Sequence, residues 1–257
     1  MKYFYILTLF ICCCYAQKAK LTADTIVQRS IDAAFYSGED RKAITKLFIY
    51  DKKGNVRERF FTVLRTNLSK KEQNYYMHFV RPTDVRNSTF LTIKKQDKDD
   101  QRWLYFPALD FVKRIAPSKK RTSFVGSHFY YEDTTGRKIE DDKHQLAKIT
   151  DDYYLIKSTP IKKDVEFSYY ISWINRKHFL PVKIVYYNKK KQKYRILSSL
   201  KIELIQNYPT ITKQQVEDLN RKGKTILISE KVEYNIGLTK SIFNETSLRN
   251  PPIKWLK

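Results

Sequence analysis

Residues 123–138 read SFVGSHFYYEDTTGRK and contain two of the six glycines of the chain, Gly126 and Gly136. Three aromatic residues stand together at positions 129–131, and an acidic pair follows at 132–133. Glycines, aromatic rings and carboxylates in this order are compatible with a catalytic loop, a metal-binding loop or a structural hinge beside an apolar space. The remainder of the sequence distinguishes these three interpretations.

The N-terminal segment has the layout of a secretory signal peptide. Lys2 precedes a continuous apolar run over residues 3–15. This run is shorter than the about 20 residues that a membrane-spanning helix needs. Cys14 and Ala16 occupy the positions of the small residues before a cleavage site, so we expect residues 1–16 to be removed. The expected location of the mature chain is then periplasmic or secreted.

All three cysteines of the chain, Cys12, Cys13 and Cys14, lie in this segment. An alternative is therefore a lipid anchor on one of them, which would make the chain a membrane-anchored lipoprotein. After cleavage, residues 17–257 carry neither a disulfide nor a thiol nucleophile. Their length suits one large domain, and we find no change in composition that would mark a linker.

The formal net charge of +23 raises the question of an anionic partner. Nucleic-acid binding is one interpretation of such a charge. Export argues against it, and an anionic membrane surface is a better partner for an exported basic chain. Because the lysines are spread through the sequence, with local basic clusters at 119–121 and 189–191, we interpret most of the charge as solvated surface. We expect no specific nucleic-acid partner.

The pattern of apolar residues predicts one helix followed by many strands. The helix is expected at residues 22–36, with Thr22 or Asp24 as its N-cap and Gly38 at its end. About eleven short strands follow, antiparallel because their connections are short. Helical turns are expected at 119–124 and 213–220, and a short closing helix at 243–248. The segments with strand character are residues 43–51, 56–65, 72–81, 90–95, 102–106, 111–116, 145–149, 153–159, 167–174, 181–187, 194–205 and 224–235.

Several of these strands are apolar on both faces. In the second strand, Phe60 and Leu64 point to one side, and Phe61 and Val63 point to the other. A sheet with two apolar faces must be covered on both, or it must line an apolar cavity.

Motifs of common catalytic and metal sites are missing from the sequence. We find no phosphate-binding loop, nucleophile elbow, HExxH or CxxC. The four histidines are far apart in the chain, and the acidic run at 97–100 lacks the glycine and distal glutamate of a calcium loop. We therefore expect a binding protein rather than an enzyme, with no cofactor, no metal and no catalytic residues.

Two neighbouring regions carry a resemblance to a known family. Residues 102–109 read RWLYFPAL and run on to VKRI at 112–115. FVGS at 124–127 then leads into FYYED at 129–133. These segments resemble the W-x-Y-x-P, R-R-I and F-x-G-S-D-F-x-Y-E-D pattern of the outer-membrane lipoprotein-sorting proteins, in their LolA-like and mostly uncharacterised branch. The ending FNETSL at 243–248 is similar as well.

This resemblance implies a mainly β fold, a curved incomplete antiparallel β-barrel with helices covering its concave face, as in LolA and LolB. It implies a monomeric carrier or chaperone that binds the acyl chains of a lipid or lipoprotein. The alternative within the same fold is a periplasmic sensor or adaptor that docks to an inner-membrane transporter without cargo. One departure stands out, because His128 occupies the position where the family usually has aspartate.

The resemblance and the strand pattern together select the candidate site residues. In strand 102–106, Trp103 and Tyr105 share one face while Leu104 and Phe106 share the other, and we expect one pair to line the space beneath the helices. The expected cavity residues are Trp103, Tyr105, Phe106, Phe124, Phe129 and Tyr131, and the expected structural residues are Arg114, Gly126, Ser127, Glu132 and Asp133.

The opening segment is then interpreted as structural. Phe129 and Tyr131 share one face of an extended segment, and Tyr130 points the other way. Gly126 is expected at a positive φ. The carboxylates that follow either cap the next helical turn or pair with Arg114 or Arg121.

Overall fold

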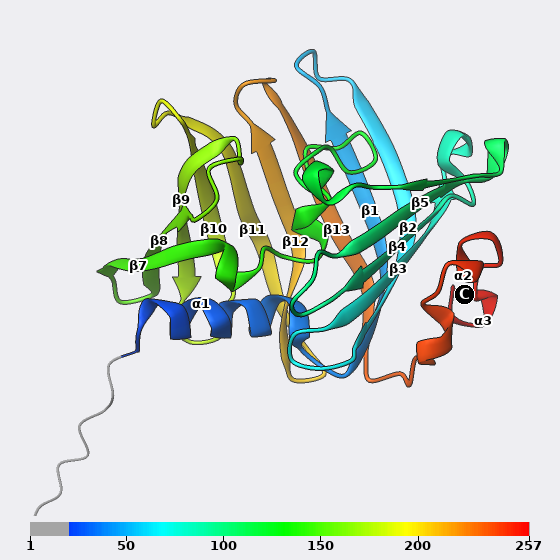
Figure 1. The fold of residues 1–257 in the computed structure, drawn as a ribbon, viewed down its shortest axis with the longest axis horizontal. Helices are drawn as coiled ribbons and strands as arrows, with labels where there is room; N and C mark the ends of the chain where they lie inside the picture. Colours follow the sequence, from blue (N-terminus) through cyan, green and yellow to red (C-terminus); the bar gives the residue numbers. More distant parts are fainter. Residues whose placement is uncertain (1–20, 257) are drawn as a thin grey trace, which may run out of the picture.

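The computed structural model describes residues 21–256, so the expected signal peptide and its three cysteines lie outside the described residues. Three α-helices and thirteen strands are found within these residues, besides short 3-10 and π-helical turns (Figure 1). They are α1 Ala23–Ile31, β1 Asp40–Tyr50, β2 Val56–Asn67, β3 Gln73–Arg81, β4 Thr89–Lys94, β5 Gln101–Phe106, β6 Phe111–Arg114, β7 Asp142–Ile149, β8 Tyr153–Pro160, β9 Phe167–Asn175, β10 Pro181–Asn188, β11 Lys193–Ile205, β12 Tyr208–Asp218, β13 Gly223–Tyr234, α2 Thr246–Arg249 and α3 Ile253–Leu256.

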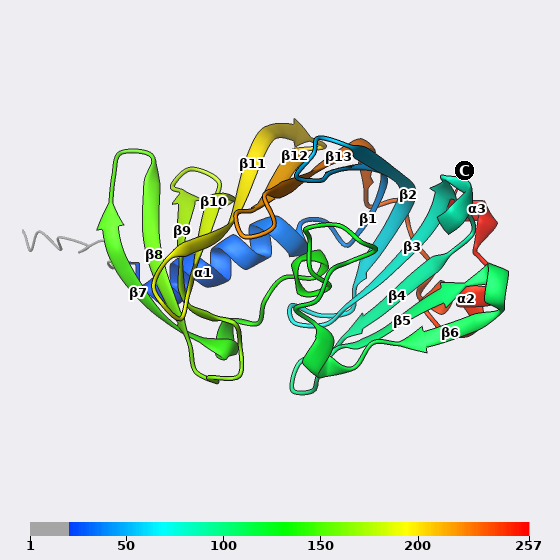
Figure 2. The ribbon, with the colours of Figure 1, turned by 90° about the horizontal axis from the view of Figure 1, so that it is seen from above.

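All the described strands belong to one sheet, in the order β6-β5-β4-β3-β2-β1-β13-β12-β11-β10-β9-β8-β7. Every neighbouring pair is antiparallel. The sheet is strongly curved and does not close, because β6 and β7 are free edges (Figure 2). The predicted curved and incomplete antiparallel barrel is thus confirmed.

One predicted element is wrong. Residues 213–220 were expected to form a helical turn, but they continue β12 and the turn after it. β12 pairs with β11 on one side and β13 on the other, so its backbone hydrogen bonds are satisfied in both directions. Thr210, Thr212 and Val216 are buried at alternate positions, which is the period of a strand.

The N-terminal helix begins and ends where the sequence predicts. The Oγ1 atom of Thr22 accepts a hydrogen bond from the N–H of Thr25 at 3.1 Å. The helix continues after α1 as a π-helical turn, Asp32–Tyr36, and stops before Gly38, which has a φ of +67°. Figure 2 shows α1 lying inside the curve of the sheet. Ile26, which is fully buried, packs there in a cluster with Ile156 of β8 and Ile174 of β9.

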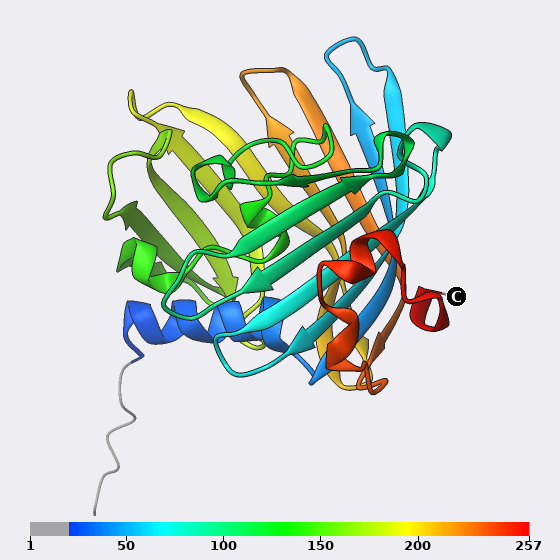
Figure 3. The ribbon, with the colours of Figure 1, turned by 45° about the vertical axis from the view of Figure 1, so that its right-hand side comes forward.

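The two faces of the sheet have separate cores. Phe61 of β2 belongs to a cluster on the concave side, and Leu64 of the same strand belongs to a cluster on the convex side. The convex cluster is completed by Leu238, Phe243 and Leu248 from the C-terminal segment. Figure 3 shows this segment, with α2 and α3 in red, on the outside of the sheet. Both apolar faces are therefore covered, and the closing helix lies on the outer face instead of the concave one.

None of the helices among the residues that the structure describes is long and apolar enough to cross a membrane.

Candidate functional site

An apolar cavity of about 280 Å³ lies on the concave side of the sheet. Its volume is close to the lower end of the roughly 300–1,000 Å³ that is usual for small-molecule sites. One wall is formed by the sheet, including Leu47, Val63 and Leu227, and another by the end of the N-terminal helix, including Ile31 and Ala34.

The third wall belongs to residues 117–142, here called the strap, which crosses the concave side between β6 and β7. Phe124 and Phe129 of the strap line the cavity. The two residues close a short turn, in which the N–H of Phe124 donates to the carbonyl of Phe129 at 2.8 Å. Tyr131 packs behind them, with its ring centroid 5.6 Å from that of Phe124 and 5.5 Å from that of Phe90. Aromatic packing therefore fixes the inner face of the strap.

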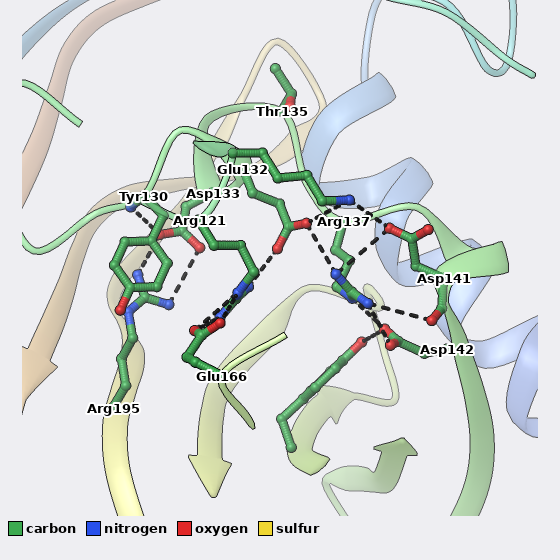
Figure 4. A network of polar contacts seen from close by, with 12 residues as sticks. Arg121, Tyr130, Glu132, Asp133, Thr135, Arg137, Asp141, Asp142, Glu166 and Arg195 are labelled. Carbon is green, nitrogen blue, oxygen red and sulfur yellow. Dashed lines mark hydrogen bonds and ion pairs between the residues drawn. The ribbon is translucent and has the colours of Figure 1, made fainter. Parts of the chain in front are cut away.

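The strap is also held by buried ion pairs (Figure 4). The carboxylate of Glu132, whose side chain is 4% exposed, pairs with Arg121, with Arg137 at 3.1 Å and with Lys120 at 3.3 Å. Arg121 also reaches Glu166, next to β9, at 2.7 Å. The predicted partner Arg121 is confirmed.

A second ion pair joins the strap to the sheet. Arg195 of β11, which is 1% exposed, pairs with the carboxylate of Asp133 and donates to the carbonyl of His128 at 3.1 Å. Asp133 also accepts from the N–H of Tyr130 at 2.6 Å. The predicted capping of the helical turn is wrong, because Asp133 lies within the turn Glu132–Thr134, whose N-cap is Tyr131 and has no side-chain hydrogen bond. The guanidinium carbon of Arg195 lies 4.1 Å from the ring centroid of Tyr130. Through these contacts Glu132 and Asp133 have a structural role, because they hold the strap in place.

The ion pairs of Glu132 make the stability of the fold depend on pH. Burial raises the pKa of this carboxyl, but Arg121, Arg137 and Lys120 outweigh burial and lower the pKa from 4.5 to about 2. A group with a depressed pKa in the folded state stabilises the fold above its unfolded pKa and loses that effect as pH falls. We therefore expect the free energy of unfolding to fall between about pH 4.5 and about pH 2, as measured by urea titration.

The matched variant is Glu132→Gln. It is expected to be less stable than the parent chain near neutral pH and to show a flatter dependence on pH below about 4.5. A parent chain whose stability stays constant down to about pH 2 would contradict the ion pairs.

His128 is placed by β13. Its N–H donates to the Oγ1 atom of Thr225 at 3.0 Å, and its Nδ1 atom lies 2.9 Å from the same oxygen. Burial lowers the pKa of the imidazole. The ring also fills the space beside Gly223, where a Cβ atom would lie 2.6 Å from the His128 Nε2. In this chain, then, position 128 fastens the strap to the sheet.

The other predicted cavity residues lie elsewhere. Trp103 and Tyr105 are on the convex side of β5. Trp103 belongs to the apolar cluster that includes the C-terminal segment, and Tyr105 packs against that cluster. Phe106 packs against the concave aromatic cluster, and neither it nor Tyr131 is part of the cavity wall. Both faces of β5 are packed in apolar clusters, as the buried Trp103 and Leu104 show. Neither face borders the cavity, because β5 lies next to the edge strand β6, away from the cavity.

The remaining predicted structural residues are placed as follows. Arg114 is exposed on β6. Ser127 is buried, and its Oγ atom accepts from the N–H of Phe129 at 3.1 Å. Gly126 has a φ of +77°, the conformation expected for it, and its carbonyl accepts from Arg57 at 3.3 Å.

Replacement of Gly126 by alanine is expected to cost about 1 kcal/mol, because a Cβ is penalised at positive φ. A Cβ there would meet only Arg57 at 3.8 Å, so the loss is confined to backbone strain. Gly136→Ala is the matched comparison, since it adds a contact of 2.7 Å with Phe35 to the same strain. Thermal unfolding should rank Gly136→Ala as the less stable variant, and the reverse order would contradict the described strap.

The sequence analysis missed most of the cavity wall, including two charged residues, Arg41 of β1 and Arg65 of β2. In a chain of such high charge both arginines resemble ordinary surface residues. Their positions along the strands could have identified them, because residues two apart share a face of the sheet. Arg41 stands two residues before the buried Ala43, and Arg65 stands two residues after Val63.

The comparisons with known proteins agree with this fold. A family model described as "Uncharacterized protein" matches residues 71–250. The solved structures that match include a lipoprotein-sorting protein, a LolA superfamily protein and a DUF1329 family protein. The chain belongs to the family of the matching model, and its fold is LolA-like. No curated protein matches the chain.

Three solved structures show the extent of the LolA-like fold. A DUF1329 family protein from Desulfovibrio piger is 25% identical, with a TM-score of 0.78 over 87% of this chain and 95% of that one. A putative outer-membrane lipoprotein-sorting protein domain from Vibrio parahaemolyticus is 22% identical, with a TM-score of 0.80 over 88% and 98%. A LolA superfamily protein from Nitrosomonas europaea is 18% identical, with a TM-score of 0.67 over 88% and 99%. The predicted LolA-like fold is confirmed.

Proposed function

We propose that this protein is an exported, non-enzymatic carrier that binds the acyl chain of a lipid or lipoprotein in its concave cavity. In this proposal residues 1–16 are a signal peptide, and residues 17–257 form one domain that acts in the periplasm. The observation that carries the proposal is the apolar cavity between the sheet, the N-terminal helix and the strap.

The physical chemistry of the cavity supports this function. Burying one CH₂ group of an acyl chain contributes about 0.8 kcal/mol, so apolar walls alone can provide affinity. The strongly perturbed carboxyl beside the cavity, Glu132, is fully engaged in ion pairs. Within residues 21–256 no group of three or more histidine, cysteine or acidic residues is arranged to hold a metal. Binding is thus the activity that these walls are suited to.

The direct test is to purify the mature chain, extract it with solvent and identify bound lipids by mass spectrometry. A fluorescent acyl probe then measures binding to the lipid-free protein. The adaptor alternative predicts a folded protein that neither carries nor binds an acyl chain, but that crosslinks in cells to one membrane partner.

A cavity-filling variant localises the binding. Ala34→Phe places a ring in the cavity from the end of the helix, and we expect it to weaken the acyl probe about tenfold or more, because the ring occupies the space of several buried CH₂ groups. Ala108→Phe is the matched control, since Ala108 is exposed in the turn after β5 and outside the cavity. Equal weakening by both variants would show that the probe binds somewhere else.

A further inference from the structure

Two arginines stand side by side in the wall of the cavity. Arg41 of β1 and Arg65 of β2 are directly opposite each other in the strand register, and both border the cavity. Tyr234 of β13 and Tyr75 of β3 flank them in the same row of the sheet. Like charges directly opposite each other across a strand pair destabilise a sheet. The arrangement therefore calls for a negative group nearby.

Arg65 is held by backbone carbonyls. The residue is 3% exposed, and its guanidinium donates to the carbonyl of Phe35 and, at 2.5 Å, to that of Ser37. Both carbonyls lie at the C-terminal end of the N-terminal helix, which carries partial negative charge. Arg65 thus fastens this helix to the sheet, and its positive charge stays in the cavity wall without a carboxylate partner among residues 21–256.

Arg41 has no such partners. Within the described part of the chain its guanidinium makes no hydrogen bond and no ion pair, and its buried Nε atom is unsatisfied. It lies over the ring of Tyr234, whose centroid is 5.8 Å from the guanidinium carbon. Arg41 is half-buried, and a partly desolvated cation without a partner is destabilising, because its lost hydration is not replaced by other polar contacts.

The carboxylates near the cavity are all engaged. Asp40, the acid whose charge acts on Arg65, accepts at 2.7 Å from the N–H of Ile236 and at 2.7 Å from that of Leu238. The two acids that border the cavity are held by the cations of the strap and by Arg195. The missing partner of Arg41 is then best supplied by a ligand.

We propose that the cavity takes an acyl chain with an anionic head, a carboxylate or a phosphate, and that Arg41 binds this head. A guanidinium offers two parallel N–H donors that match the oxygens of either anion. Arg65 contributes the second positive charge and positions the helix that covers the chain. This inference rests on the proposed function, because the apolar part of the same cavity would hold the acyl chain.

The experiment measures competition of three ligands with a fluorescent acyl probe: a long-chain fatty acid, its methyl ester and a lysophosphatidic acid of equal chain length. The parent protein is expected to bind at least one of the two anions about tenfold more tightly than the ester. The stronger of the two anions identifies the head as carboxylate or phosphate. In Arg41→Met the acid, the phosphate and the ester are expected to bind equally, at the level of the ester.

Two controls separate the possible outcomes. Arg86→Met removes an exposed arginine in the turn before β4 and should leave the preference for the anion intact. The ligand-free Arg41→Met variant is expected to melt no lower than the parent, which shows that it is folded. If the parent binds ester and anions equally, the anionic head is wrong while the acyl carrier stands. If it binds none of the three, the proposed function fails and this inference with it.

Discussion

Replacing Arg195 by methionine is expected to lower the free energy of unfolding by about 3–5 kcal/mol, because the buried carboxylate of Asp133 then loses its counter-charge. Arg195 is 1% exposed and joins β11 to the strap through Asp133 and the carbonyl of His128. Methionine keeps most of the volume of the side chain, so the effect reports on charge rather than on a cavity. Urea unfolding of the parent and the variant measures the difference.

The double variant Arg195→Met with Asp133→Asn is the matched control. Asparagine keeps an oxygen that can accept from the N–H of Tyr130, and it leaves no uncompensated charge. The double variant is therefore expected to recover part of the lost stability, since a buried pair removed as a whole costs less than one partner removed alone. If the stability lost in the double variant equals the sum of the losses in Arg195→Met alone and Asp133→Asn alone, the two side chains do not interact.

Replacing Trp103 by alanine is expected to cost about 3–5 kcal/mol and to leave acyl binding unchanged. Trp103 is 6% exposed and packs on the convex side with Leu64, Leu91 and Leu248. The cavity lies on the opposite side of the sheet, so the lost contacts are those that hold the C-terminal segment. Thermal unfolding and titration of the acyl probe measure the two effects separately.

The control is Trp173→Ala on β9. Trp173 is half-buried, and its neighbours Ser172 and Ile174 border the cavity, so the tryptophan points to the outer face. The same chemical change is therefore expected to cost less there. A Trp103→Ala variant that keeps its melting temperature and loses the acyl probe would instead place Trp103 at the mouth of the binding site.

The fold was predictable because its signals are local. The alternation of apolar residues marks most of the strands, and the motif around Gly126 indicates the family. β12, Tyr208–Asp218, was missed because much of its sequence is polar, and its pairing with β11 and β13 outweighs that composition. Strand conformation at such a segment is decided by its neighbours in the sheet.

The site was predictable only in part. Alternation along a strand shows which residues share a face, but it does not show which face is concave. The sequence establishes that Trp103 and Leu104 point to opposite sides of β5, but the direction in which the sheet curves decides which side is concave. Of the candidate cavity residues, Phe124 and Phe129 line the cavity, because they lie in the strap that forms its wall. The meeting of Arg41 with Arg65 depends on the register between two strands, which no local pattern contains.

The two free edges of the open sheet carry a risk that a closed barrel would avoid. An exposed edge strand can pair with the edge of another molecule and start aggregation, and natural proteins counter this with charged side chains, above all lysine. β6 presents Lys113 and Arg114 to solvent, and β7 presents Lys143 and Lys148. Two such edges repel each other. Part of the large positive charge of this protein therefore protects its solubility, and keeps one copy of the sheet from extending into the next.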